Sequence, residues 1–474
     1  MATNATKSSP NTSLIDAPVN KMLFKMAAPI SIGMMSTFLF QIVDTYFVGQ
    51  LGSNELAALA FSSTAYFMFI AVFIGMSIGV SSVVAKAAGA ADIAKVRLLT
   101  TLALLLVIIL SGVASFAARE AIAPMFSGLG ADATVLPLID SYMSILYLSF
   151  PLLVFGIVGS GAVRATGVLM LTEVIFAIAG VINLVFDYLL IFGIGPFPEL
   201  GLEGAAIATA MSFGFIFIGM TVIMLRKQLI SIVSLFNFAA VWHGFKDIFK
   251  IALPTIIMQL LVPATGMFVT FLLAGYGAEM VAAFGVASRI EALALIGIFA
   301  VSSAMTPFIA QNFGAGRHDR IDTAIIFAGK ASLYMGVVIF IALALLGPWI
   351  AAIFSQDPKI INFVTFYFRI VAVSYGFYGI LNVTSAIFNG LQLPLLSLKL
   401  MSVKTLLFTI PPLFLAAYFN VTVILIALAA SNIAAGIYAG FEMRKSERKH
   451  GRPVADLSVF RDIWQDIKNL FSLK

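Results

Sequence analysis

The chain has no cysteine, which excludes disulfide bonds and thiolate-ligated metal sites. It has three histidines, His243, His318 and His450, far apart in sequence and next to basic residues, as in solvated loops, so a histidine metal site is not expected. Charged residues are scarce at 11%, whereas 61% of residues are hydrophobic and the mean hydropathy is +1.06. This composition excludes a soluble globular chain and indicates a polytopic membrane protein.

Apolar stretches of the length needed to cross a bilayer, about 20 residues each, predict twelve membrane helices and an all-α integral membrane fold. The predicted spans are 25–48, 56–80, 98–117, 136–156, 171–192, 202–224, 251–274, 281–305, 324–347, 361–386, 394–418 and 421–441.

Basic residues gather in alternate connections between the spans, whereas the opposite connections carry only Arg119 and Lys359. The basic set is Lys86, Lys95, Arg97, Arg164, Arg226, Lys227, Lys246, Lys250, Arg317, Arg320, Lys330, Lys399 and Lys404, with more in both tails. By the positive-inside rule, both termini are expected in the cytoplasm, with the chain in the inner or plasma membrane. The net charge of +6 is then a topology signal, and no nucleic-acid partner is expected. The polar N-terminal tail lacks the apolar core of a secretory signal, so the first span is expected to direct insertion and to remain.

The chain repeats itself. Sliding the first half along the second so that Pro29 falls on Pro254 also places Ala90 on Ala315, without a gap, and we call this shift the repeat offset. Further on, a slightly shorter shift places Gly156 on Gly379. Two six-helix bundles of the same orientation, related as parallel repeats, are therefore expected.

The predicted division of the chain follows from this repeat. It comprises a cytoplasmic tail 1–24, an N-lobe 25–225, an inter-lobe linker 226–250, a C-lobe 251–442 and a basic, amphipathic cytoplasmic tail 443–474. Apolar residues alternate with charges in the linker and recur at helical spacing from Asp456 onward. A helix lying on the cytoplasmic membrane face is therefore expected in each of these two segments.

Asp44 and Asp187 are each the only charge in a long apolar stretch. A carboxylate in the middle of a membrane helix costs roughly 2.5–3.5 kcal/mol on insertion scales, so such residues usually have a function. Both lie beyond the expected midplane of their spans. Asn183 precedes Asp187 by four residues and so shares its helix face, and Thr209 in the sixth span reaches a similar depth.

Two carboxylates, an amide and a hydroxyl offer oxygen ligands to a small cation, and two neighbouring carboxylates could equally share a proton. The set Asp44, Asn183, Asp187 and Thr209 is therefore a candidate coupling-cation site. Alternatively, each aspartate hydrogen-bonds a neighbouring helix or faces a water-filled crevice. In the repeat, Asp44 corresponds to Val269 and Asp187 to Ile410, so the acidic pair belongs to the first half alone.

Several short motifs are informative when taken together. They are Ala28-Pro29, Val43-Asp44-Thr45, Phe47-Val48-Gly49, Leu51-Gly52, the segment 183–187 and the segment 204–209. Together they resemble the multidrug and toxic compound extrusion (MATE) transporters of the MOP superfamily. The resemblance extends from Ala28 to about Glu442 and implies two six-helix bundles that export cationic or amphipathic compounds in exchange for H⁺ or Na⁺.

Within this family the constellation around Asp44 resembles the N-lobe cation site of the DinF-like branch. NorM-like members carry further acidic residues in the C-lobe, where this chain has Gln259 and Tyr378, so a C-lobe sodium site is not expected.

Arg289 and Glu291 lie in the eighth predicted span. At a separation of two residues they point to different faces of the helix, so each needs a partner elsewhere. A structural ion-pair network and a role in gating are both open.

The predicted function is secondary active multidrug efflux by alternating access, with H⁺ or Na⁺ as the coupling ion, no cofactor, and no metal beyond Na⁺ at the same site. The expected partners are small-molecule drugs or toxic organic compounds and membrane lipid, and the expected state is a monomer. The alternative is a flippase for lipid-linked saccharides from the same superfamily. No catalytic motif points to an enzyme.

Overall fold

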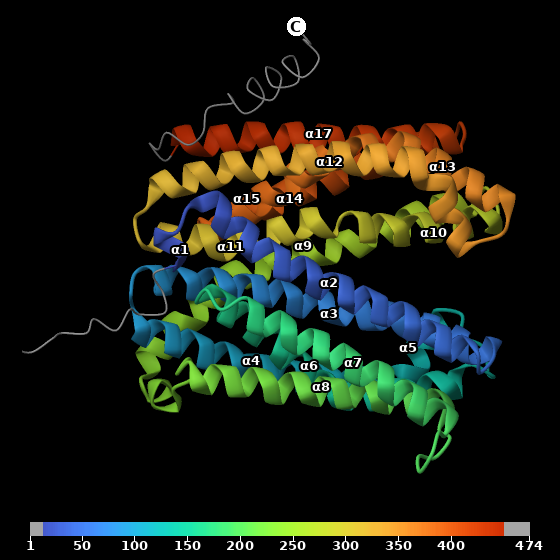
Figure 1. The fold of residues 1–474 in the computed structure, drawn as a ribbon, viewed down its shortest axis with the longest axis horizontal. Helices are drawn as coiled ribbons and strands as arrows, with labels where there is room; N and C mark the ends of the chain where they lie inside the picture. The colour runs from blue at the N-terminus through green and yellow to red at the C-terminus, as the bar shows by residue number, and fades with distance from the viewer. Residues whose placement is uncertain (1–12, 450–474) are drawn as a thin grey trace, which may run out of the picture. The chain divides into compact units, whose positions relative to one another are not determined.

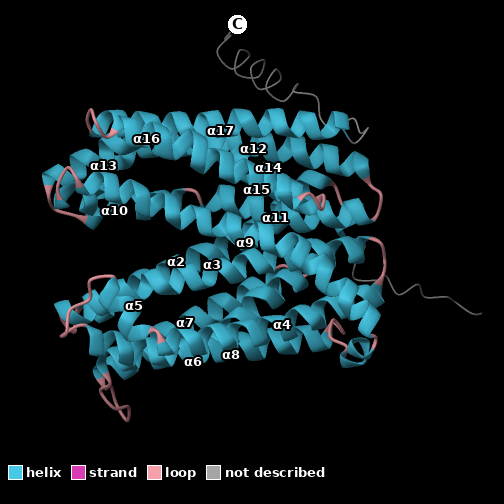
Figure 2. Ribbon diagram, turned by 180° about the vertical axis from the view of Figure 1, so that it is seen from behind, coloured by secondary structure: helices cyan, strands magenta, loops and turns pink. Residues whose placement is uncertain are grey.

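A computed structural model describes residues 13–449, and none of these residues forms a strand (Figure 2). The first helices are α1 Ser13–Asp16, α2 Val19–Gly49, α3 Ser53–Gly89, α4 Ile93–Glu120, α5 Ile122–Gly128, α6 Leu136–Ala165, α7 Met170–Phe192 and α8 Gly201–Arg226. After a 3-10 helix, Ile232–Phe236, follow α9 Phe238–Ala274, α10 Ala278–Ala294, α11 Ile296–Gly314, α12 His318–Phe354, α13 Pro358–Val371, α14 Tyr375–Gly390, α15 Pro394–Val403, α16 Ile410–Ala416 and α17 Val421–Lys449. Within the described residues, twelve helical segments are long and apolar enough to cross a membrane, which confirms the twelve predicted spans.

The helices form two compact units (Figure 1). One unit, called the N-unit, comprises Ile32–Ile256, and the other, the C-unit, combines the chain up to Ser31 with the chain from Ile257. Both boundaries fall inside helices, in α2 and α9, shortly after Pro29 and Pro254. The predicted lobes, 25–225 and 251–442, remain a prediction, because the compact units divide the chain within helices instead of in the linker.

The structure preserves the internal repeat in its helix ends and hydrogen bonds. At the repeat offset, the start of α3 falls on the start of α10, and the end of α3 falls on the end of α11. The Ser77 hydroxyl donates to the Ile157 carbonyl at 2.8 Å in the N-unit. Its counterpart in the C-unit, Ser302, donates to the Asn382 carbonyl at 3.0 Å, and both partners are related by the same offset.

The same repeat offset still relates the two halves of the chain at the ends of the fourth and tenth spans. The slightly shorter shift that Gly156 and Gly379 suggested for this region is wrong. Gly167 and Gln392 each follow the end of a helix, and each has a positive φ, 86° and 64° respectively. These two residues correspond to each other at the unchanged repeat offset. Farther along, α7 and the segment Pro394–Ala416 are equal in length, 23 residues each. Aligning them end to end places Asp187 on Pro411 and not on Ile410, and the acidic pair still has no acidic counterpart.

The N-unit packs its helices closely through glycine. A Cβ atom at Gly75 would lie 2.5 Å from Cα of Ile256, and one at Gly161 would lie 2.8 Å from the carbonyl oxygen of Ser77. The Thr255 hydroxyl donates to the Gly75 carbonyl at 2.7 Å, at the same contact of α3 with α9. Small residues let helix backbones approach in this way, as is usual for membrane helices.

Three spans of the C-unit depart from regular α-helix. The eighth span is divided at Leu295, between α10 and α11. The tenth contains a 3-10 turn, Ala372–Ser374, between α13 and α14. The eleventh contains a π-helix, Lys404–Thr409, between α15 and α16. Short 3-10 and π segments inside longer helices are frequent at functional sites.

The linker is organised differently from expectation. Instead of a separate helix along 226–250, the 3-10 helix Ile232–Phe236 precedes α9, which begins at Phe238 and continues into the seventh span. Tethers to α4 fix this segment within the N-unit: Lys95 pairs with Asp247 at 2.8 Å, and Arg97 donates to the Gln228 carbonyl at 2.9 Å. The helix predicted from Asp456 onward lies outside the described residues.

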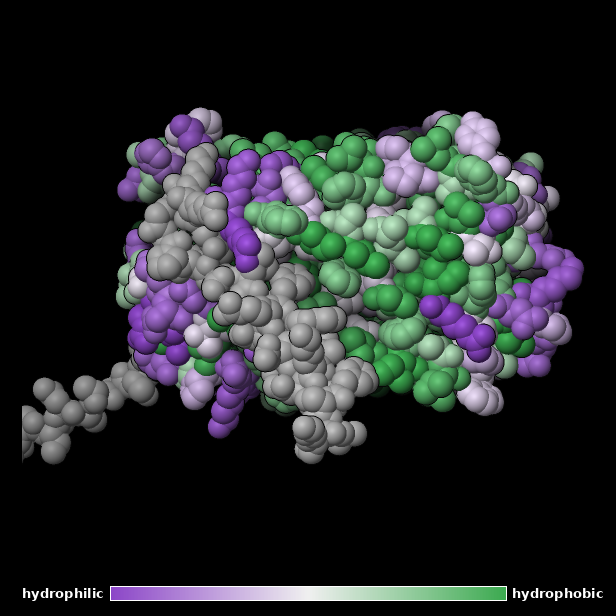
Figure 3. All heavy atoms as spheres, turned by 90° about the horizontal axis from the view of Figure 1, so that it is seen from above, coloured by the Kyte–Doolittle hydropathy of each residue, from purple (hydrophilic) through white to green (hydrophobic). Residues whose placement is uncertain are grey.

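Figure 3 shows a face of the C-unit on which hydrophobic side chains gather over the middle of the helices and hydrophilic side chains toward their ends. Large apolar side chains of α12 are exposed, including Val338, Leu345 and Ile353. This pattern is the one that a lipid-facing surface requires, because apolar side chains exposed to hydrocarbon are at no disadvantage.

Candidate functional site

Asp44 of α2 and Asp187 of α7 interact electrostatically within the N-unit, as their predicted common site requires. The Asp187 side chain is 1% exposed, and Asp44 is half-buried. Since both carboxylates lie in helices long enough to span a membrane, their mutual repulsion acts in a medium of low dielectric constant.

Asn183 and Thr209 lie beside Asp187, as the sequence predicted. The Asn183 amide nitrogen donates to Oδ1 of Asp187 at 3.3 Å and to Oγ1 of Thr209 at 3.2 Å. These bonds connect α7 with α8, and they leave the Asn183 amide oxygen available as a ligand.

Each aspartate keeps one buried oxygen without a hydrogen-bond partner among the described residues, namely Oδ1 of Asp44 and Oδ2 of Asp187. Leaving a buried polar group unsatisfied costs about 1–3 kcal/mol, and more when the group is charged. A cation or proton at this place would satisfy both oxygens and reduce the repulsion between the two carboxylates.

Two tyrosines that the sequence reasoning missed complete the polar surroundings. Tyr66 of α3 interacts electrostatically with Asp44, and Tyr142 of α6 interacts with Asp44, Asp187 and Tyr66. One signal could have identified Tyr142, because it falls on another tyrosine, Tyr367, at the repeat offset.

Arg289 and Glu291 do not pair with each other, as their separation of two residues predicted. Arg289 is exposed and has no ion-pair partner within the described residues, whereas Oε2 of Glu291 accepts a hydrogen bond from the Tyr367 hydroxyl at 2.5 Å. Glu291 also interacts electrostatically with Lys404. Lys404 was expected in a cytoplasmic connection, but it lies near the middle of the eleventh span, Pro394–Ala416.

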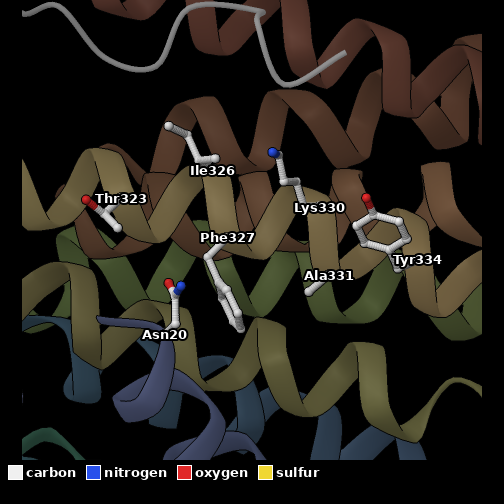
Figure 4. Close-up of a pocket in the computed structure, with 7 residues that line it drawn as sticks. All are labelled: Asn20, Thr323, Ile326, Phe327, Lys330, Ala331 and Tyr334. Atoms are coloured by element: carbon white, nitrogen blue, oxygen red, sulfur yellow. The ribbon is translucent and has the colours of Figure 1, made fainter. Parts of the chain in front are cut away.

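A pocket in the C-unit contains none of the predicted site residues (Figure 4). It is lined by Asn20, Thr323, Ile326, Phe327, Lys330, Ala331 and Tyr334. In Figure 4 all of these side chains except Asn20, which belongs to α2, are spread along α12 without convergence on one point, so the pocket does not suggest a substrate.

Comparison with known proteins places this arrangement in a family. The MatE family profile matches residues 29–189 and 254–415, two segments that reproduce the internal repeat. A FAD transporter of Shewanella oneidensis is 34% identical over 425 residues, which are 90% of this chain and 94% of that protein. The multidrug export protein MepA of Staphylococcus saprophyticus is 25% identical over 377 residues, 79% of this chain and 81% of MepA.

Solved structures agree with these sequence matches. The Vibrio cholerae MATE transporter VcmN in its bent form has a TM-score of 0.85 and 27% identity, covering 92% of this chain and 98% of VcmN. A MOP superfamily transporter from Pyrococcus furiosus shares the fold, with a TM-score of 0.86 at 24% identity over 94% of this chain and 99% of that one. The chain is therefore a multi-pass membrane transporter, not an enzyme, and it belongs to the MATE family.

Proposed function

We propose that this protein is a secondary active exporter in which the N-unit site of Asp44, Asn183, Asp187 and Thr209 binds the coupling cation, H⁺ or Na⁺. The buried, unbonded oxygens of the two interacting aspartates support this proposal most directly. Its substrates are cationic or amphipathic organic compounds, as the similarity to multidrug export proteins suggests. The DinF-like assignment, the cytoplasmic termini and the location in the inner membrane belong to the same proposal.

In this mechanism, the cation enters between Asp44 and Asp187 and removes their repulsion, which draws α2 toward α7. A changed position of α2 alters the N-unit, so cation and substrate favour different conformations of the transporter. Exchange then follows from alternating access, because the free energy of cation entry offsets that of substrate export.

Transport by purified protein in liposomes tests the proposal, with the fluorescent cation ethidium as probe and imposed pH or sodium gradients. Asp44→Asn should abolish gradient-driven transport, whereas Asp140→Asn, at an exposed carboxylate, should not affect it. Comparing sodium-free and sodium-containing buffers at fixed pH identifies the ion. Gradient-driven transport by Asp44→Asn at the unsubstituted rate would falsify the role of the site.

Flavin dinucleotide is a second candidate substrate, because the relative that is 34% identical over 90% of this chain is a FAD transporter. Export of FAD from liposomes loaded with this fluorescent dinucleotide tests it directly. A lipid-linked saccharide flippase, the remaining alternative, is less well supported, since both halves of the chain match the MatE profile.

A further inference from the structure

A second buried polar cluster lies in the C-unit, and the proposed cation mechanism does not use it. We call it the C-unit cluster; it consists of Glu291, Tyr367, Tyr375, Tyr378 and Lys404. Glu291 accepts the hydrogen bond from Tyr367, and Lys404 Nζ lies 4.7 Å from the centre of the Tyr378 ring. Lys404 and Tyr375 both interact electrostatically with Glu291.

All three irregular spans of the C-unit contribute to this cluster. Glu291 lies four residues before the break at Leu295, Tyr367 and Tyr375 flank the 3-10 turn Ala372–Ser374, and Lys404 begins the π-helix. Departures from regular helix in three spans meet at this cluster, and such departures are frequent at functional sites. They indicate a site whose geometry is determined by function.

The C-unit cluster and the N-unit cation site occupy corresponding places in the repeat. At the repeat offset, Glu291 corresponds to Tyr66 and Tyr367 to Tyr142, and each pair interacts within its own unit. In the C-unit the seventh span contributes no acidic residue, because its counterpart of Asp44 is a valine. The eleventh span of the C-unit contributes Lys404, whereas its counterpart in the N-unit, the fifth span, contributes Asp187. The same framework therefore holds a cationic side chain in one unit and acidic side chains in the other.

Three members of the cluster keep some accessible surface. Glu291, Tyr378 and Lys404 are half-buried, whereas Tyr367 and Tyr375 are buried, at 1% and 0% exposure. The buried Tyr375 hydroxyl lies near Glu291 and Tyr367 without a hydrogen bond of good geometry. An ammonium group and a free hydroxyl are the donors that an oxyanion needs, and the Tyr378 ring offers an aromatic surface beside them.

We propose that the C-unit cluster binds a phosphate group of the transported substrate, with Lys404 and the Tyr375 hydroxyl as donors. This deepens the proposed export function and rests on it. Glu291 interacts with Lys404 in the empty site and competes with the incoming phosphate. Lys404 exchanges one anionic partner for another, and Tyr367 keeps its hydrogen bond to the Glu291 carboxylate, which stabilises that charge while the phosphate is bound.

Competition between Glu291 and the ligand gives the two substitutions opposite effects. Lys404→Met removes the cationic donor and should weaken binding of the phosphate, whereas Glu291→Gln removes the competing anion and should strengthen it. A purely structural Glu291–Lys404 interaction predicts instead that both substitutions impair the protein alike.

Flavin mononucleotide and riboflavin are suitable probes, because they differ only in a phosphate and both are fluorescent. Their affinities are measured at fixed pH with full-length protein in neutral detergent. The ratio of the two affinities isolates the phosphate contribution from effects on folding. The unsubstituted protein should favour flavin mononucleotide, Lys404→Met should lower the ratio roughly 10- to 100-fold, as expected for a lost charged hydrogen bond, and Glu291→Gln should raise it.

Lys399→Met is the matched control, because Lys399 lies five residues earlier in the same span and pairs with Glu442 at 2.6 Å. It should leave the ratio unchanged. An unsubstituted protein without a phosphate preference, an unchanged ratio in Lys404→Met, or a lower ratio in Glu291→Gln overturns the proposal. Loss of the phosphate preference on adding phosphatidylglycerol overturns the assignment to substrate, since a lipid headgroup then occupies the site.

Asp44→Asn separates this inference from the proposed function. This variant should lose gradient-driven transport and keep the phosphate preference. If Asp44→Asn transports normally while Lys404→Met still lowers the ratio, the cation mechanism fails and the phosphate site stands.

Discussion

The amide nitrogen of Asn183 lies 3.2 Å from the hydroxyl oxygen of Thr209 and donates a hydrogen bond to it. This bond joins two neighbouring spans, α7 and α8, at the level of Asp187. The Thr209 hydroxyl therefore orients the amide that in turn contacts the carboxylate.

Replacement of Thr209 by valine keeps the volume of the side chain and removes this hydroxyl. Because the net value of one such hydrogen bond is about 0.5–1.5 kcal/mol, the affinity for the coupling cation should fall roughly 2- to 13-fold while transport persists. Cation dependence of ethidium transport in liposomes measures the change. Thr221→Val, in the same helix with its hydroxyl bonded to the Phe217 carbonyl, is the control. An unchanged cation dependence would remove Thr209 from the site.

Gly75→Ala should destabilise the N-unit. The new Cβ would lie 2.5 Å from the backbone of Ile256, which cannot yield as a flexible side chain can, so the cost should be about 1–3 kcal/mol. Gly112→Ala is the matched control, because no atom outside its own stretch of helix lies within 4 Å of the added Cβ. Thermal unfolding in detergent should show a lower Tm for the first variant alone. Equal Tm values would mean that α3 and α9 are not in close contact in the protein.

Arg320 secures the segment before the first span. Its guanidinium donates to the carbonyls of Leu14 and Ala17 at 3.1 and 2.6 Å and to Oδ1 of Asn312 at 2.9 Å, with 7% of the residue exposed. Arg320→Met leaves these acceptors unsatisfied, at a cost of about 2–4 kcal/mol. Hydrogen exchange around residues 14–22 should accelerate.

Arg317→Met provides the comparison for that experiment. Arg317 is half exposed, and its pair with Asp319, at 3.6 Å, lies on the surface. Such a pair contributes at most about 1 kcal/mol. Similar exchange rates in the two variants would show that Arg320 does not hold the segment.

The ion pairs of Arg164 and Lys95 should differ in their contribution to stability. Arg164 forms an ion pair with Glu173 at 3.2 Å and donates a hydrogen bond to the Ser160 hydroxyl at 3.0 Å. The Arg164 side chain is 24% exposed and the Glu173 side chain 11%. The Lys95 pair with Asp247 is 47% and 43% exposed. Arg164→Met should therefore lower Tm clearly and Lys95→Met only slightly, because water screens the second pair. The reverse order would contradict this assignment.

The sequence was sufficient for much of the fold and for the acidic half of the site. The length of each apolar stretch predicts a span. A single charged residue within such a stretch is conspicuous, which is why Asp44 and Asp187 could be identified. Asn183 follows from helical periodicity alone.

Contacts between distant spans were harder to predict. The partner of Glu291 is 76 positions away, on another helix, and nothing local to Glu291 indicates Tyr367. Lys404 was assigned to a cytoplasmic connection because lysines usually lie there, although it falls inside the predicted span 394–418. The π-helix that holds it at mid-span depends on packing against neighbouring helices, which no local pattern records.

The unit boundaries inside α2 and α9 have a consequence for biosynthesis. The N-unit is complete only once the ribosome has made Ile256, and the C-unit needs residues made at the very start of translation. Neither half of the chain, cut at the linker, carries all the helices of its own unit. The start of the first span, up to Ser31, can therefore complete its packing only after the spans that follow Ile257 have been made.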